Sequence, residues 1–565
     1  MIASSFYTRL YLRSLTPFEL LELSKQSDLQ VVGSHSPEYM EVWIQSAVGK
    51  ETTDELFDSY LTANKLSLED VRLMMSKVEE AELEQIPSWV NMLQSISEDY
   101  TAVSDQIGQE ENRPFYHILQ PFLAYFKSTF LEQLGQSSLI DEETVIEQLA
   151  EKLYRELFQT GNPVFFQSFQ DFKAIHRFQM NDDGQKDYYY QQFCRFTLSD
   201  NFRTLFGNYP LLARMLATTT ERFLKFTLNM SAHLDADLGE IEKKFEIDID
   251  KVKEINLGSG DLHNGEATAI FEFNNGHKVV YKPRNVQITD AYNQLISWVN
   301  ENLNETLRFF KVIVKEDYGW LEFIDYKECE TEQDVELFYE RAGMLLGLGY
   351  FLNARDCHHE NVIASGNCPI LIDHETLVGP EIKVFNKQKI PADSEQALMG
   401  SVLETMLIPT GFAKYPAYIF GFGSSLPQNI QSTIEKIVDS NQDEMNKVYK
   451  TVSNSIYSSN KPRLNGQIAG LKDYQDQFKK GFSTVYQLVQ AHSEFLLSDQ
   501  SPIQLFRDVG IRFINRKSNI YYKILRILKQ PQFLKDATKF GFKLELLARA
   551  YLKKESFSAD HLLAF

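Results

Sequence analysis

The stretch RDCHHENVIASGNCPILIDHE, residues 355–375, decides how this chain is interpreted. Two aspartates, three histidines and two glutamates lie within these 21 residues. Side chains of these types ligate metals and transfer protons, so their density predicts a reaction centre. A zinc site and a phosphoryl-transfer loop are the two competing kinds of centre, and a polar surface loop without chemistry is a third possibility.

The spacing of the oxygen-bearing side chains favours phosphoryl transfer. Asp356 and Asn361 are five residues apart, and Asp373 follows VIASGNCPILI, whose pattern predicts two short strands around a Ser-Gly-Asn turn. In protein kinases the catalytic aspartate also precedes a metal-binding asparagine by five residues, and a second metal-binding aspartate follows later. One carboxylate would accept the proton of the substrate hydroxyl, while the amide oxygen and the other carboxylate would hold Mg²⁺.

A zinc site would require His358, His359 and His374 to converge on one ion. Adjacent histidines on an extended chain point to opposite sides, and the chain has neither an H-E-x-x-H motif nor two histidines four residues apart. The cysteines form no C-x-x-C pair, so the sequence indicates neither a multi-cysteine zinc site nor a disulfide framework. We therefore expect a reducing, cytoplasmic setting for the four cysteines, which are Cys194, Cys329, Cys357 and Cys368.

Length and composition restrict the other classes of protein. A chain of 565 residues, 43% of them hydrophobic, can bury large cores and should divide into about three or four domains or subdomains. The net charge of −21 disfavours nucleic-acid binding, because phosphate contacts need clustered Lys and Arg, so any phosphate site must be local. No stretch resembles a signal peptide or approaches 18 uninterrupted apolar residues, which predicts a soluble protein without a transmembrane segment.

The period of the apolar residues divides the chain into three regions. Residues 1–245 have mainly helical spacing, as in DELFDSYLTANKLSLEDVRLMMSKVEEAEL (54–83) and EETVIEQLAEKLYRELFQ (142–159), and predict a helical N-terminal region. Residues 246–420 mix strands and helices and predict a kinase-like core. Residues 421–565 predict a second mainly helical region, and from about residue 380 onward we expect helices again.

The core region should contain two strand pairs. ATAIFEF (267–273) and HKVVYKP (277–283) predict strands joined by a hairpin turn at Asn274-Asn275-Gly276. RFFKVIVK (308–315) and GWLEFIDY (319–326) predict the second pair.

Helical patterns alternate with these strands. ITDAYNQLISWVNENLNETL (288–307) lies between the pairs, and DVELFYERAGMLLGLGYFLNA (334–354) runs directly into the quoted stretch. This order is that of a small nucleotide-binding lobe joined to a larger helical lobe.

Two features near the first strand pair fit a nucleotide. Lys282 ends a predicted strand after a glycine-containing turn, as expected for a lysine that reaches an ATP phosphate, although it could also be an ordinary exposed strand lysine. GSGDLHNGEATA, residues 258–269, stands where a phosphate-covering loop belongs, and its glycines would let backbone amides approach a phosphate.

Four motifs resemble the dehydratase domain of class II lanthipeptide synthetases, the LanM family. They are GDLHNGEA (260–267), VVYKPR (279–284), GWLEFI (319–324) and GLGYFLNARDCHHENVIASGNCPILIDHETL (347–377), and the resemblance covers about residues 200–530. It implies an α+β fold, with a lipid-kinase-like two-lobed core and added helical regions. It also implies an enzyme that uses ATP and Mg²⁺ to phosphorylate Ser and Thr of a ribosomal precursor peptide with a leader. The enzyme would then eliminate phosphate to give dehydroamino acids.

The resemblance also implies roles for individual residues. In the kinase centre, the resemblance implies that Asp356 and His358 are catalytic residues and that Asn361 and Asp373 bind the metal. For elimination, the family pattern Arg-x-x-x-Arg-x-Thr is matched by RFINRKS (512–518), in which serine replaces the threonine. An arginine can stabilise the departing phosphate while a hydroxyl assists proton transfer. The remaining assignments are Arg512 and Ser518 for elimination, and Asp261, His263 and Lys282 for the nucleotide.

The sequence departs from the family at its C-terminus. Family members continue into a zinc-dependent cyclase, whereas this sequence stops at SADHLLAF without such ligands. We therefore expect a stand-alone dehydratase with a separate cyclase as partner, one half of a split synthetase, or a shortened chain. The sequence is also compatible with a peptide kinase that does not eliminate phosphate, and with a noncatalytic peptide-binding scaffold.

Overall fold

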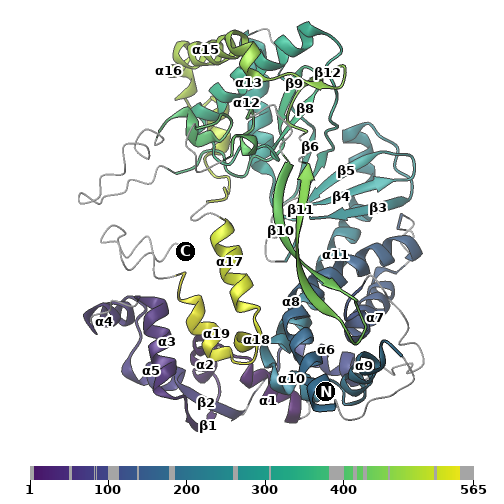
Figure 1. Cartoon of the computed structure of the whole chain (residues 1–565). Coiled ribbons are helices and arrows are strands. Elements are labelled where there is room, and N and C mark those ends of the chain that lie inside the picture. The colour runs from purple at the N-terminus through teal and green to yellow at the C-terminus, as the bar shows by residue number, and fades with distance from the viewer. Residues whose placement is uncertain are drawn as a thin grey trace.

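The computed structural model has a mainly helical N-terminal part and a mixed core at its opposite end (Figure 1). Helix and sheet are both extensive, which confirms the mixed fold class. The structure describes residues 5–49, 54–81, 83, 85–98, 113–135, 139–140, 142–176, 185–258, 265–303, 307–380, 400–410, 416–423, 429–455, 459–513 and 518–547.

The N-terminal region is mainly helical, as predicted. Its two longest helices, α8 (Glu142–His176) and α11 (Pro210–Phe245), pack against each other and against α7 (Tyr116–Leu134). On α7, the fully buried Phe126 and Phe130 are four residues apart and therefore lie on one face of the helix. Apolar faces of this kind explain why the region folds as packed helices.

A small unit before these helices contains a strand that the helical period did not predict. SKVEEA, expected to be helical, forms β2 (Ser76–Ala81) and pairs antiparallel with β1 (Leu29–Ser34). The preceding helix, α5 (Leu68–Met74), has a capping box at Ser67 and ends before this segment. Because α5 ends there, the chain extends and places Val78 in a core.

Five antiparallel strands form the core sheet in the order β3-β4-β5-β7-β6. Both predicted strand pairs are confirmed, since β4 pairs with β5 and β6 with β7. The hairpin between β4 and β5 turns at Gly276, whose φ of 88° favours glycine. The strands are β3 (Val252–Leu257), β4 (Ala269–Phe273), β5 (Lys278–Lys282), β6 (Val312–Val314) and β7 (Gly319–Glu322).

Two predicted helices and a predicted hairpin complete the core. Helix α12 (Gln287–Leu303) connects β5 to β6, and α13 (Glu332–Phe351) leads into the quoted stretch. Strands β8 (Val362–Ser365) and β9 (Cys368–Leu371) then form the short hairpin expected around Gly366. Helix α15 (Gln475–Ala491) packs along α13.

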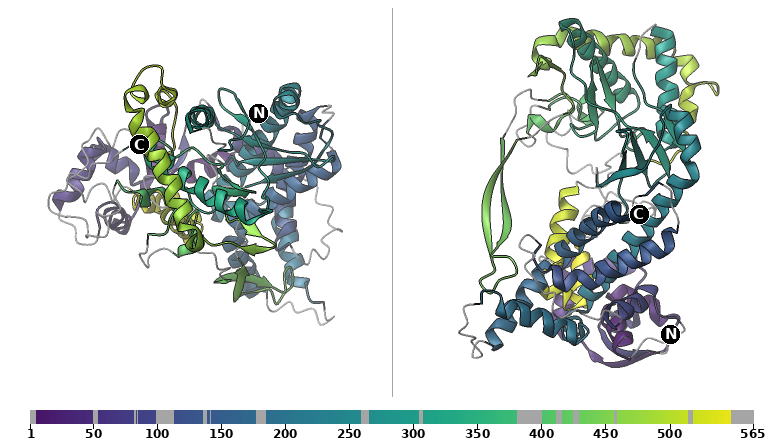
Figure 2. Two further views of the ribbon diagram at one scale, coloured as in Figure 1. Left: turned by 90° about the horizontal axis from the view of Figure 1, so that it is seen from above. Right: turned by 90° about the vertical axis from the view of Figure 1, so that its right-hand side faces the viewer.

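A long two-stranded ribbon departs from the expectation of helices beyond residue 380. Strands β10 (Asn429–Val438) and β11 (Asn446–Ser455) pair antiparallel in continuous register. The ribbon runs from the core toward the N-terminal helices (Figures 1 and 2). At its tip, Asn441 accepts a hydrogen bond from the Phe115 amide at 2.9 Å and donates one to the Arg113 carbonyl at 3.1 Å. The ribbon therefore links two parts of the molecule that are distant in sequence.

The C-terminal helices return to the small N-terminal unit. Phe542 on α19 stacks on Trp43 with 4.7 Å between ring centroids.

Within the described ranges, no helix combines the length and the apolar character that crossing a bilayer requires. The remaining elements are α1 (Ser5–Arg13), α2 (Pro17–Ser24), α3 (Pro37–Ala47), α4 (Asp54–Ala63), α6 (Ser88–Glu98), α9 (Tyr188–Ser199), α10 (Arg203–Asn208), α16 (Ser493–Leu496), α17 (Ser518–Leu528), α18 (Pro531–Leu534), α19 (Ala537–Leu544), the 3-10 helices η2 (Val402–Thr405), η3 (Ala417–Ile419), η4 (Leu471–Tyr474) and η5 (Pro502–Phe506), and strands β12 (Arg463–Leu464) and β13 (Gln467–Ile468).

Candidate active site

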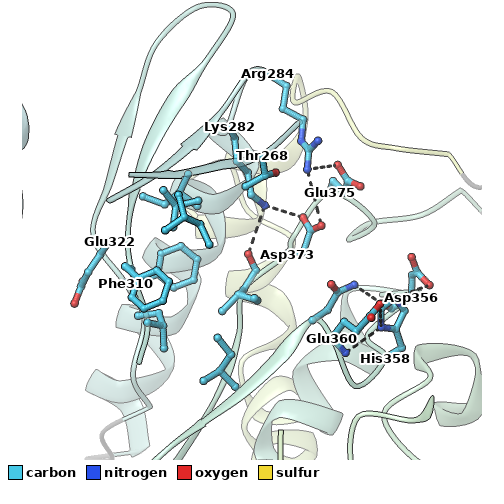
Figure 3. A pocket seen from close by; sticks show the side chains of 18 of the residues that line it. Thr268, Lys282, Arg284, Phe310, Glu322, Asp356, His358, Glu360, Asp373 and Glu375 are labelled. Atoms are coloured by element: carbon cyan, nitrogen blue, oxygen red, sulfur yellow. Dashed lines mark hydrogen bonds and ion pairs between the residues drawn. The ribbon is translucent and has the colours of Figure 1, made fainter. Parts of the chain in front are cut away.

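A cavity of about 610 Å³ lies between the core sheet and the β8–β9 hairpin. One part of its lining is apolar and the other is densely charged (Figure 3). Such a two-part lining suits a ligand with a flat apolar group and an anionic group. The apolar part consists of Ile270, Val280, Phe310, Leu321, Ile324, Ile363 and Ile372, and the charged part includes Lys282, Arg284, Asp356, Asp373, Glu375 and Arg512.

The last residue of β5, Lys282, meets the residue that follows the β8–β9 hairpin. Its ammonium Nζ lies 3.0 Å from Oδ1 of Asp373, and only 8% of the lysine is exposed. Burial alone would raise the pKa of Asp373, but the charges of Lys282 and Arg284 outweigh burial and lower its pKa. The aspartate is therefore held as a carboxylate beside two cations.

The loop after α13 is bent so that Asp356 and Asn361 share one side of the cavity. Asp356 has a φ of 60°, which an aspartate tolerates better than most residues. The Asn361 side-chain Nδ2 donates to the Asp356 carbonyl at 2.8 Å, and the Ile372 amide donates to the Asn361 carbonyl at 2.9 Å. These bonds fix the Asn361 amide so that its side-chain oxygen is the atom suited to a cation.

The three histidines of the quoted stretch have different surroundings. His358 lines the cavity with Nε2 3.9 Å from an oxygen of Asp356, whereas the Nδ1 of His359 lies 3.2 Å from the Ile419 carbonyl. His374 is buried against Tyr292, and burial lowers the pKa of its imidazole to about 3, so it is neutral. In the part of the chain that the structure describes, no group of three or more His, Cys, Asp or Glu is arranged to hold a metal.

Two arginines and a glutamate form a cluster beside Asp373. Glu375 lies 2.9 Å from a guanidinium nitrogen of Arg284 and 2.7 Å from one of Arg512, and Arg284 reaches Asp373 at 3.9 Å. The Arg512 amide also donates to the Glu375 carbonyl at 2.6 Å. The segment that carries Arg512 is thus fixed to the cavity. Two guanidinium groups, those of Arg284 and Arg512, lie in the charged part of the cavity lining.

Sequence reasoning assigned no role to Arg284 and Glu375. Arg284 lies two residues after Lys282, and alternate residues of an extended segment face the same side, which was the available signal. Glu375 lies two residues after Asp373 and carried the same signal. Its pairing with Arg512 joins residues 137 positions apart and had no sequence signal.

The structure brings together most of the residues singled out from the sequence. Ser518 is not among the residues that line the cavity, and it is exposed at the start of α17. Asp261 and His263 lie outside the described residues, although Gly258 just before them does line the cavity. The predicted residues that line the cavity are Lys282, Asp356, His358, Asn361, Asp373 and Arg512.

Comparisons with known proteins agree with the motifs. A family model described as "Domain of unknown function (DUF4135)" matches residues 209–564, which include every lining residue of the cavity. A curated relative, the Lacticin 481/lactococcin biosynthesis protein LcnDR2 of Lactococcus lactis subsp. lactis, is 23% identical over 354 residues. The aligned part is 59% of this chain and 37% of the relative, so the chain spans little more than a third of that protein.

Proposed function

Because the chain belongs to the DUF4135 family, whose domain is found in LanM-type lanthipeptide synthetases, we propose that it is a lanthipeptide dehydratase. It would use ATP, with Mg²⁺ as the metal cofactor, to phosphorylate Ser and Thr of a ribosomal precursor peptide. It would then eliminate the phosphate. A lipid-kinase-like two-lobed core and a cytoplasmic location are parts of the same proposal. The convergence of Lys282, Asp356, Asn361 and Asp373 on one cavity is the observation that carries it.

The residues present fit a magnesium nucleotide. The apolar lining offers a place for a purine, while Lys282 and Arg284 offer positive charge to phosphates. The oxygen of the Asn361 amide and the carboxylate of Asp373 would hold Mg²⁺, which is usually bound by one or two carboxylates together with substrate phosphates. Bound ATP supplies the phosphoryl group, and the metal ion lowers the charge repulsion around it.

The residues around the peptide hydroxyl have separate tasks in this proposal. Asp356 would orient the Ser or Thr hydroxyl and accept its proton during transfer. His358, whose Nδ1 accepts a hydrogen bond from the Glu360 amide at 3.1 Å, would present its other nitrogen toward Asp356. Arg512 would then bind the phosphate as it leaves, when the α-proton of the phosphorylated residue is removed.

The direct test is mass spectrometry of a precursor peptide incubated with the protein, ATP and Mg²⁺. The peptides to be tried are short Ser-, Thr- and Cys-rich sequences encoded near this gene. We expect products lighter by one water for each modified residue, and none when Mg²⁺ is removed by EDTA. Asp356→Asn should give no product, while Asp317→Asn, in an exposed turn away from the cavity, should behave as wild type. Unmodified peptide with wild-type protein would refute the proposal.

A peptide kinase without elimination is the second candidate. The observation in its favour is the place of Ser518, which is exposed at the start of α17 and does not line the cavity. Products that remain heavier by phosphate with the wild-type protein would identify this activity.

A further inference from the structure

Helix α17 presents an apolar face that the described residues leave exposed. The exposed fractions are 41% for Ile520, 50% for Leu525 and 42% for Ile527, and Tyr521 beside them is 36% exposed. Its last residue, Leu528, is buried, so the helix is anchored at one end. In Figure 1 this helix stands apart from the others along most of its length.

The other side of α17 is basic. Lys523 and Arg526 are exposed there, three residues apart and so adjacent on the helix surface. No Asp or Glu occurs between Asp508 and Asp536, although the whole chain has a net charge of −21. The helix therefore combines an apolar stripe with a positive rim in an otherwise acidic protein.

The helix begins close to the candidate active site along the chain. Arg512 lines the cavity, and Ser518, six residues later, is the first residue of α17. Six extended residues span at most about 20 Å. The start of α17 therefore lies within about 20 Å of Arg512 at the charged end of the cavity, and Ile527, nine helical residues later, lies at most about 14 Å further away.

From these observations we propose that α17 is a docking surface for an acidic, amphipathic segment of the peptide substrate. Its apolar residues would pack in the stripe of Ile520, Tyr521, Leu525 and Ile527, and its carboxylates would pair with Lys523 and Arg526. This inference rests on the proposed function, because it requires a peptide substrate. It adds the chemical class of the segment that is recognised and the surface that recognises it.

The placement of α17 favours a peptide over a membrane surface. In Figure 1 the helix lies between the core and the helices α3 and α4, and in the right-hand view of Figure 2 it lies between the β10–β11 ribbon and α11. A flat bilayer would meet these elements before it met α17. A single peptide segment needs contact only with α17 itself, through side chains that are exposed.

Fluorescence anisotropy with the full-length protein tests the docking surface. The probe is a labelled amphipathic peptide of about 20 residues with Leu at helical spacing and Glu on its other face. We expect Leu525→Asp to weaken binding of this probe by about tenfold or more. Leu497→Asp is the matched control, because Leu497 is 84% exposed after α16 and should leave binding unchanged.

A charge exchange tests the basic rim independently. The double variant Lys523→Glu and Arg526→Glu should lose the Glu probe and bind a version of it in which Lys replaces Glu. Equal binding of both probes by wild type, or an unchanged affinity in Leu525→Asp, would overturn the proposal. Leu525-dependent binding to phosphatidylcholine vesicles containing one quarter phosphatidylglycerol, without binding of the peptide, would assign the surface to membranes instead.

The proposed function and this inference fail in distinguishable ways. A short Ser-containing peptide without any acidic segment, supplied at high concentration, should be phosphorylated equally by wild type and Leu525→Asp. If the short peptide is phosphorylated but the probe binds equally to both proteins, the docking surface is wrong. If nothing is phosphorylated under any condition, the enzymatic proposal is wrong, and specific probe binding to α17 would mark a peptide-binding scaffold.

Discussion

At the scale of single residues, Asp373 is the side chain on which the proposed phosphoryl transfer depends most. Asp373→Asn keeps the shape but removes the negative charge that would hold the metal and that pairs with Lys282 at 3.0 Å. We expect the rate of peptide phosphorylation to fall by more than about a hundredfold, while the circular dichroism spectrum stays that of wild type. Phosphorylation at the wild-type rate would show that Asp373 is not a metal ligand.

Arg512 separates the two chemical steps. A guanidinium near the departing phosphate should help elimination far more than the preceding transfer. We expect Arg512→Ala to accumulate peptide that is heavier by phosphate, and Ser518→Ala to do so more weakly because water can replace part of a hydroxyl. Both outcomes are visible in one mass spectrum. Normal dehydration by Arg512→Ala would mean that the elimination site lies elsewhere.

The residue scale also shows how far the sequence could predict the site. The five-residue spacing of Asp356 and Asn361 predicted their shared cavity, because both lie in one loop whose geometry is local. The clamp of Glu375 by Arg512 could not be predicted in this way, since it depends on where a distant segment returns to the core.

At the scale of elements, glycines set how closely α13 and α15 approach. A Cβ on Gly343 would lie 1.9 Å from the Phe478 carbonyl oxygen, and one on Gly481 would lie 1.8 Å from that of Glu340. We expect either alanine variant to lower the free energy of unfolding by about 2–3 kcal/mol, measured by urea denaturation. Gly349→Ala on the same helix meets only ordinary contacts of 3.6–3.7 Å and should be neutral or stabilising. Equal effects at these sites would argue against the close crossing.

Asp237 fixes helix α11 to the core sheet. Its carboxylate accepts hydrogen bonds from Trp320 and Tyr318, both at 2.9 Å, and pairs with Lys315 at 2.8 Å. Burial alone would raise the pKa of Asp237, but the hydrogen bonds from its three partners outweigh burial and lower its pKa. A depressed folded-state pKa stabilises the fold above the unfolded value of about 4, and this stabilisation is lost as the pH falls through the folded-state pKa.

Asp237→Asn should therefore cost stability in a pH-dependent way. We expect a loss of about 3 kcal/mol at neutral pH, because a buried acceptor of charge-assisted hydrogen bonds is removed. The difference from wild type should shrink as the pH falls below about 4 in urea titrations. Glu240→Gln is the control, since Glu240 pairs with the same Lys315 but has a side chain that is 54% exposed. A deficit in Asp237→Asn that does not change with pH would contradict the charge-based explanation.

The elements that the sequence predicted well are those with a strong local period. Helix α13 and the hairpin at Gly276 carry their own signals, and both are confirmed. The ribbon β10–β11 was not predicted, because Ile434 and Ile437 have helical spacing while many residues of the ribbon are exposed on both faces. Its stability comes from cross-strand pairing and from its anchored tip, neither of which a short window of sequence reveals.

At the scale of the whole molecule, this ribbon joins the core to the N-terminal helices through its tip. The tip is fixed in three ways: by Asn441, by Met445 in the large helical core, and by Asp443, whose side chain accepts a hydrogen bond from the Tyr190 amide at 2.9 Å. A two-stranded ribbon alone is only marginally stable in water. We infer that the anchored tip keeps the ribbon ordered and couples the core to the N-terminal helices.

Removing the Asn441 side chain tests this coupling. Asn441→Ala would leave the buried Phe115 amide without its acceptor, at a cost of about 1–3 kcal/mol. The Arg113 carbonyl would lose one donor but keep the Tyr116 amide at 3.2 Å. Because the tip anchors the ribbon, we expect amide hydrogen exchange to quicken along Asn429–Ser455 and the sheet β3–β7 to keep its protection. Lys450→Ala, exposed on the same ribbon and away from its tip, should leave exchange unchanged. If Asn441→Ala lowered stability while exchange in the ribbon stayed slow, cross-strand pairing would hold the ribbon without the tip, and the coupling inferred between the core and the N-terminal helices would have to run through the contacts of α11 with the sheet.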